Sequence, residues 1–110
     1  MAINTEIPTN EWADFFTTFS NDTRGRAVSI QTIDPVSGDS GVVGQGPLQA
    51  VDYDPADKGN DIIISLGTDT IDASHTIAAP VALWRAQLDS GEISALEIID
   101  QNDGKTLIVL

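Results

Sequence analysis

The sequence predicts an α+β, mainly β domain, with one N-terminal amphipathic helix packed on a strongly curved antiparallel sheet or small open barrel of about six strands. Residues 9–20 place their aromatic side chains at helical spacing, and short apolar or alternating runs bounded by turn residues follow. No second helical segment is available to cover a parallel sheet. A length of 110 residues suits one domain over residues 1–110.

The helix is the segment with the clearest pattern. Residues 1–8 are expected to form an extended lead-in, and residues 9–20 the helix. Its apolar positions are Trp12, Phe15, Phe16 and Phe19, which fall at the i, i+3, i+4, i+7 spacing of one helical face. Thr9 is the expected N-cap. So short a helix is marginal alone, and we expect it to bury these rings on the strands.

Residues 26–110 are expected to form antiparallel strands joined by turns. Residues 34–47 contain four glycines and two prolines, which predicts a long glycine-rich loop. Residues 81–88 could form a strand or a helical turn, and we prefer the strand. Asn102-Asp103-Gly104 is the clearest hairpin signal. The expected strands are residues 26–33, 48–53, 61–67, 74–78, 81–88, 93–100 and 106–110. The expected core comprises Trp12, Phe15, Phe16, Phe19, Ile62, Ile64, Leu96 and Ile98.

The composition excludes several classes of protein. The net charge is −12, and the five basic residues are scattered, so a role on nucleic acid or on an anionic membrane surface is not expected. The chain has no cysteine, no signal-peptide pattern and no apolar run of transmembrane length. We therefore expect a cytoplasmic, soluble protein without a cofactor.

The pattern resembles a family of small, mainly bacterial domains of unknown function. Its members begin with a proline, tryptophan and phenylalanine segment and continue as strands. The matching residues are Pro8, Trp12, Phe16, Phe19, Ser20, residues 61–64, Gly67, His75, Ile77, Pro80, residues 96–98 and Gly104. The resemblance spans nearly the whole chain and implies the same fold. It implies no known activity.

Two groups of polar residues are candidates for chemistry. His75 is the only histidine. On a strand, Ser74 and His75 point to opposite faces, which disfavours a nucleophile–base pair. A structural imidazole is the preferred interpretation, with a pH-dependent contact and catalysis as alternatives. The acidic turn offers Asp52, Asp54, Asp57 and Asp61 as weak calcium ligands, but their spacing fails the helix–loop–helix template and favours a solvated turn.

The leading functional hypothesis is a non-enzymatic interaction or structural domain that self-associates or binds a protein partner. An exposed strand edge in residues 107–110 or 81–84 is the expected contact. The interface candidates are Trp84, Arg85, Leu107 and Val109, because aromatic and arginine side chains are favoured at interfaces. The alternative is a ligand- or metal-binding module that uses the loop at residues 34–47 and the acidic turn at 52–61.

Overall fold

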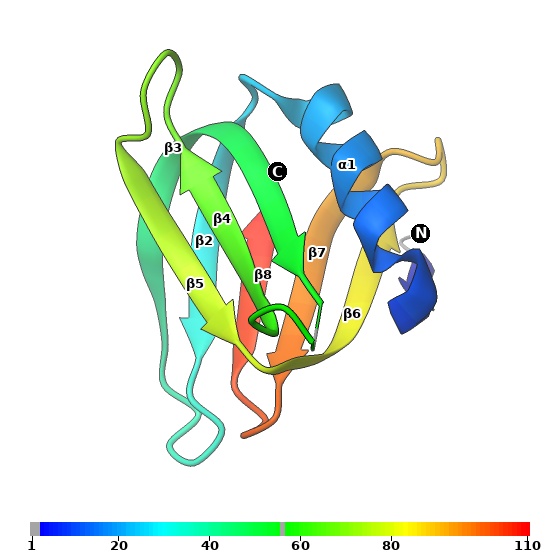
Figure 1. The fold of residues 1–110 in the computed structure, drawn as a ribbon, viewed down its shortest axis with the longest axis vertical. Helices are drawn as coiled ribbons and strands as arrows, with labels where there is room; N and C mark the ends of the chain where they lie inside the picture. Colours follow the sequence, from blue (N-terminus) through cyan, green and yellow to red (C-terminus); the bar gives the residue numbers. More distant parts are fainter. Residues whose placement is uncertain (1–2, 56) are drawn as a thin grey trace.

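The computed structural model describes residues 3–55 and 57–110, which form one α-helix followed mainly by strands (Figure 1). Residues 1–2 of the expected lead-in and residue 56 of the acidic turn lie outside the described residues. The elements are β1 (Ile3–Glu6), the 3-10 turn η1 (Thr9–Glu11), α1 (Trp12–Thr23), β2 (Ala27–Ile33), β3 (Ser40–Asp54), β4 (Asp61–Leu66), β5 (Ala73–Ala78), β6 (Pro80–Gln87), β7 (Ile93–Asp100) and β8 (Lys105–Val109).

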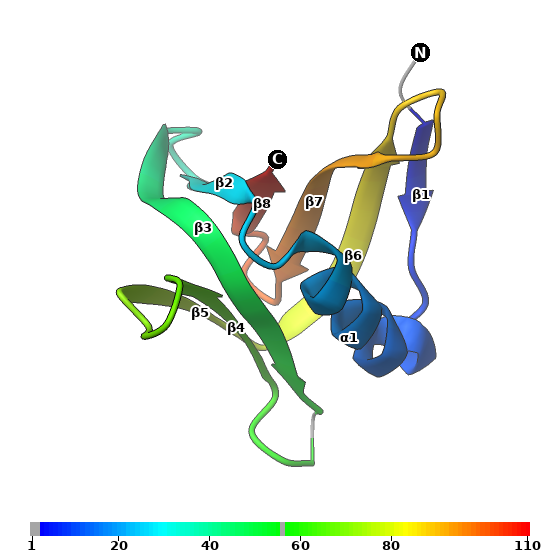
Figure 2. The ribbon, with the colours of Figure 1, turned by 90° about the horizontal axis from the view of Figure 1, so that it is seen from above.

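The strands form one antiparallel sheet in the order β1-β6-β7-β8-β2-β3-β4-β5. The sheet is bent, and α1 lies on its concave side between β3 and β6 (Figure 2). It is not closed into a barrel, because β1 and β5 lie at its two ends without pairing with each other. The predicted class, one helix and a mainly β antiparallel sheet, is confirmed. The expected number of about six strands is wrong, since the described residues form eight, including β1 within the expected lead-in.

The glycine-rich segment differs most from expectation. Only residues 34–39 form a turn, which the carboxylate of Asp34 closes by accepting hydrogen bonds from the amides of Val36 and Ser37 at 2.8 and 3.0 Å. The expected loop from 40 to 47 is instead the first half of β3, paired with β2. A β-carbon at Gly44 would lie 3.3 Å from Leu66 Cδ1. Glycine here therefore allows close packing within a strand.

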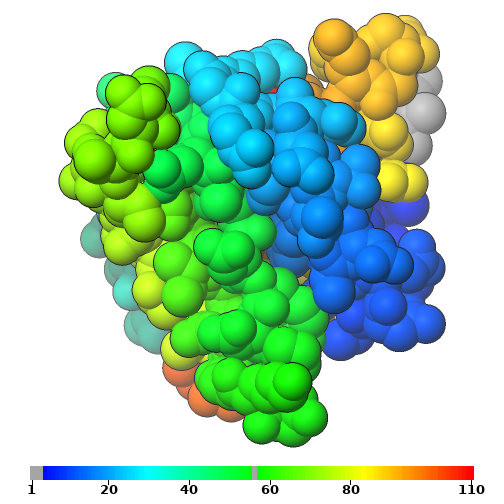
Figure 3. Space-filling view, turned by 45° about the horizontal axis from the view of Figure 1, so that its top comes forward, coloured from blue at the N-terminus to red at the C-terminus, as the bar shows by residue number. Residues whose placement is uncertain are grey.

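The aromatic face of α1 is buried as the spacing predicts. Trp12, Phe16 and Phe19 are 1–3% exposed, whereas Phe15 is only partly buried at the rim of the core. The space-filling view shows the helix lying against β3 (Figure 3). The helix continues to Thr23, and neither η1 nor α1 begins with a side-chain cap, so Thr9 does not act as the expected N-cap.

The C-terminal end of α1 is joined to β3 by hydrogen bonds. The hydroxyl of Ser20 accepts from the Val51 amide at 2.9 Å and lies 3.3 Å from the Val51 carbonyl oxygen, to which it donates. The Gly25 amide donates to Leu48 O at 2.8 Å. β2 pairs only with the first half of β3. The contacts from Ser20 and Gly25 therefore provide hydrogen-bond partners for backbone groups in the second half of β3 that would otherwise be buried without one.

The core fills the space between α1 and the concave side of the sheet. The fully buried residues include Ile62 and Ile64 of β4 and Leu96 and Ile98 of β7, four of the expected core positions. Tyr53 of β3 contacts the Trp12 ring edge-on, with ring centroids 5.3 Å apart. The other large side chains that are under 2% exposed are Trp12, Phe16, Ile30, Leu48, Leu83 and Ile108.

Candidate functional site

The convex side of the sheet carries a largely apolar surface over β6, β7 and β8, which ends at β2. Alternate residues of these strands are buried in the core, so the residues between them point outward. The strand register aligns the outward residues into rows, and one row runs from Trp84 through Glu97 and Leu107 to Gln31. We call this surface the Trp84 face. It consists of Ser29, Gln31, Ile33, Ala82, Trp84, Ala86, Ala95, Glu97, Ile99, Lys105, Leu107 and Val109.

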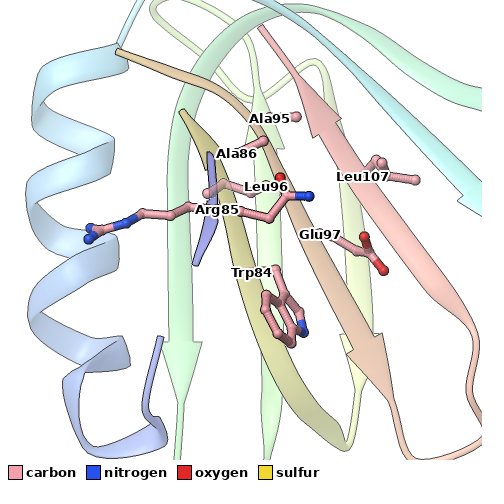
Figure 4. A pocket seen from close by; sticks show the side chains of 8 residues that line it. Trp84, Arg85, Ala86, Ala95, Leu96, Glu97 and Leu107 are labelled. Atoms are coloured by element: carbon pink, nitrogen blue, oxygen red, sulfur yellow. The ribbon is translucent and has the colours of Figure 1, made fainter. Parts of the chain in front are cut away.

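The Trp84 face contains a shallow hollow of about 310 Å³ beside the indole ring (Figure 4). Ala86 and Ala95 lie opposite each other on β6 and β7, and their small side chains leave room between Trp84 and its neighbours. Leu107 borders the hollow from β8. Trp84 is half-buried, and part of its indole ring lines the hollow.

The charge of this face differs from that of the protein as a whole. Its two charged residues are Glu97 and Lys105, whose Oε1 and Nζ atoms lie 3.7 Å apart. Such a pair adds little to stability, but it leaves the face neutral on a chain of net charge −12. Glu6 of β1, opposite Trp84, lies at the rim. The face can therefore approach another acidic surface with less repulsion than the average surface of this protein.

The structure brings three of the four predicted interface residues together. Trp84, Leu107 and Val109 share the Trp84 face. Arg85 does not, because it is aligned with the buried Leu96 on the concave side and extends toward α1 (Figure 4). The prediction that residues 107–110 or 81–84 form an exposed strand edge is wrong. β8 lies between β7 and β2, and β6 lies between β1 and β7. Any contact through these strands must use their face.

The acidic turn brings two of its four candidate ligands close together. Asp54 and Asp61 are directly opposite each other at the end of the β3–β4 pair. Asp52 lies two residues before Asp54 on β3. Loss of hydration, followed by the charge of Asp54, raises the pKa of Asp61. Among residues 3–55 and 57–110, no group of three or more His, Cys, Asp or Glu side chains is placed to hold a metal ion.

His75 lies on the edge strand β5, opposite the buried Ile64, and therefore points to the concave side. It borders a polar hollow of about 410 Å³ together with Asp34, Asp39 and Asp100. Partial burial lowers the pKa of the imidazole. The ring makes no hydrogen bond within the described residues, so the expected bond to a carbonyl or carboxylate is not found there.

The lowered pKa of His75 predicts a pH-dependent stability. The unfolded chain binds the proton more tightly than the folded one, so stability is retained above the ordinary histidine range and lost as the pH falls through it. The melting temperature of the wild type should therefore fall more between about pH 8 and about pH 5 than that of His75→Gln. Calorimetry on both proteins checks this, and parallel pH curves would contradict it.

Comparison with known proteins identifies the family but no activity. A family of unknown function, DUF5335, matches residues 3–110, and the chain belongs to it. The chain is similar to an uncharacterised protein of Aquifex aeolicus (strain VF5), with 26% identity over 102 residues, which is 93% of this chain and 86% of the other. No solved structure matches significantly. Within the described residues, no helix is long and apolar enough to cross a membrane.

Proposed function

We propose that this protein is a non-enzymatic interaction domain that self-associates through the Trp84 face. The observation that carries the proposal is the gathering of Trp84, Leu107 and Val109 on one neutral, apolar sheet face. These side chains are half-buried, and apolar patches that reach the surface mark contact sites on soluble proteins. The absence of catalysis is part of the proposal, and it is supported by the successive positions of Ser74 and His75 on β5, which turn their side chains to opposite faces.

A second copy of the chain fits this face by its charge, and the size of the face limits the strength of the contact. Two molecules of net charge −12 repel each other, so they associate most easily where each surface is neutral. Four strands about 4.8 Å apart and roughly 20 Å long give a footprint of about 400 Å². That footprint is below the roughly 800 Å² per partner of a standard interface. We therefore expect a weak two-fold dimer, with a dissociation constant in the micromolar range or above.

Leu107→Glu should abolish the dimer, because it places an unpaired charge at the centre of the contact. Sedimentation of the wild type between about 1 and about 500 µM should show a monomer–dimer equilibrium, while the variant remains monomeric throughout. Val36→Glu is the matched control, since Val36 is 95% exposed in the turn before β3 and lies outside the Trp84 face. It adds the same charge and should leave the equilibrium nearly unchanged.

Salt provides an independent measurement on the same contact. If two acidic molecules meet through neutral apolar faces, screening of their overall repulsion should strengthen the dimer as ionic strength rises from about 0.02 to about 0.5 M. A contact made by ion pairs would weaken instead. A wild type that stays monomeric at every concentration and salt level would contradict the proposal.

A further inference from the structure

Arg85 is a cation on the concave side of the sheet with no partner for its charge. It lies in one row with three core residues, Leu96, Ile108 and Ile30. Its side chain extends toward α1 (Figure 4). The Nε atom is shut off from solvent and has no hydrogen-bond acceptor, and the guanidinium makes no ion pair within the described residues. This is unexpected in a chain with seventeen acidic residues.

An arginine in this state has an unmet requirement for a counter-ion. A buried donor without an acceptor costs free energy, and more so on a charged group. The guanidinium also presents several N–H groups in a planar arrangement that matches a carboxylate. The structure therefore holds a partly dehydrated cation whose charge is not paired by any of the described residues.

Two hollows on the concave side of the sheet adjoin Arg85, and their chemistry differs. The first, of about 390 Å³, lies between α1 and the start of β7, and we call it the Arg85 hollow. Its walls include the apolar side chains of Phe15, Phe19, Ile93 and Leu110. The second, of about 530 Å³, lies near the N-terminal end of α1 and is bordered by three acids. These acids are Glu6, Glu11 and Asp14.

The Arg85 hollow is the better anion site of the two. Arg26 borders it as a second cation, and the acids Asp22 and Glu92 balance the pair of arginines. The four charged side chains around the hollow sum to zero, so a ligand with one negative charge can pair with Arg85 without strong repulsion. A dianion would be repelled more strongly by the two carboxylates and by the acidic protein as a whole. The volume lies at the small end of the range for ligand sites, about 300–1,000 Å³.

We propose that the Arg85 hollow binds a small organic monocarboxylate whose carboxylate pairs with Arg85 and whose short apolar tail packs on Phe15 and Ile93. A bound carboxylate would lie beside the charge of the half-buried Arg85, whose Nε atom is shut off from solvent, and the tail would cover the partly buried ring of Phe15. The site lies on the opposite side of the sheet from the Trp84 face, so occupancy does not require dimer formation.

The test is a titration of the full chain with hexanoate, in which NMR chemical shifts of the backbone amides report binding. The expected result is saturable shifts confined to the residues around Phe15, Arg85 and Ile93. Hexan-1-ol, which has the tail without the charge, and inorganic phosphate, which has charge without the tail, should each bind roughly tenfold more weakly or worse. Equal binding of phosphate would overturn the assignment of an apolar monocarboxylate.

Arg85→Met provides the decisive variant, because it keeps the length of the side chain and removes the guanidinium. It should weaken hexanoate binding by at least roughly tenfold. Lys58→Gln removes the same charge from the exposed β3–β4 turn and should leave the affinity unchanged. If Arg85→Met does not fold, Arg85→Lys retains the charge without the planar donor set and should still bind several-fold more weakly. Unaltered affinity in either Arg85 variant, or no saturable binding to the wild type, overturns the proposal.

Discussion

Replacing Phe16 by Ala is expected to lower the free energy of unfolding by about 3–5 kcal/mol. Its ring is 1% exposed, with its centroid 5.5 Å from that of Phe15 and 6.4 Å from that of Tyr53 on β3. Removing it leaves a cavity in the contact that holds α1 on the sheet, and the short helix has little stability of its own. Urea unfolding monitored by circular dichroism measures the loss.

Phe15→Ala is the matched control, because it deletes the same kind of ring from the preceding position of the same helix. Phe15 is only partly buried at the rim of the core, so its removal should cost about 1–2 kcal/mol. Both variants must be compared at one protein concentration, since a dimer would couple stability to concentration. A loss in Phe16→Ala no larger than that in Phe15→Ala would mean that α1 is not docked as described.

The sequence predicts those parts of the fold whose signals are local. The helix follows from the spacing of its rings, and the β7–β8 hairpin follows from Asn102-Asp103-Gly104. In that turn Asp103 has φ of 64°, and Asp100 accepts hydrogen bonds from the amides of Asn102 and Gly104. Residues 81–88 contain good helix formers, yet residues 81–87 lie in β6, because pairing with β1 and β7 outweighs a weak local preference.

Elements that depend on distant partners were not predictable. β1 is a short polar segment that becomes a strand only by pairing with β6, more than seventy residues later in the chain. The glycines of residues 40–47 resemble a loop in composition. They lie in a strand because β2 supplies the hydrogen bonds and because Gly44 must fit against Leu66. The secondary-structure propensities of single residues do not indicate which distant strand a segment will pair with.

The candidate site was predictable residue by residue but not as a surface. Trp84, Leu107 and Val109 are each conspicuous in the sequence, whereas their common face depends on the register of β6, β7 and β8. The contribution of Ala86 and Ala95 to the hollow has no sequence signal. The separation of Trp84 from Arg85 could have been found, since neighbouring residues of a strand point to opposite faces.

Gly67→Ala is expected to lower the free energy of unfolding by about 3 kcal/mol or more. Gly67 directly follows β4 and has φ of 143°, a conformation that residues with a β-carbon rarely adopt. An added β-carbon would overlap the carbonyl oxygen of Thr70 and lie 3.0 Å from the amide nitrogen of Asp72. That amide donates to Leu66 O at 2.8 Å and closes the turn into β5. Thermal unfolding measures the loss.

Gly91→Ala separates the clash from the backbone strain. Gly91 also has positive φ, 93°, but an added β-carbon there would meet no atom of the described residues within 4 Å. It should therefore cost only about 1–2 kcal/mol, the penalty of the left-handed conformation. Equal losses in the two variants would mean that the β4–β5 turn adapts freely. Because backbone atoms rather than a flexible side chain block the position, we expect the turn to resist and the edge strand β5 to lose its pairing with β4.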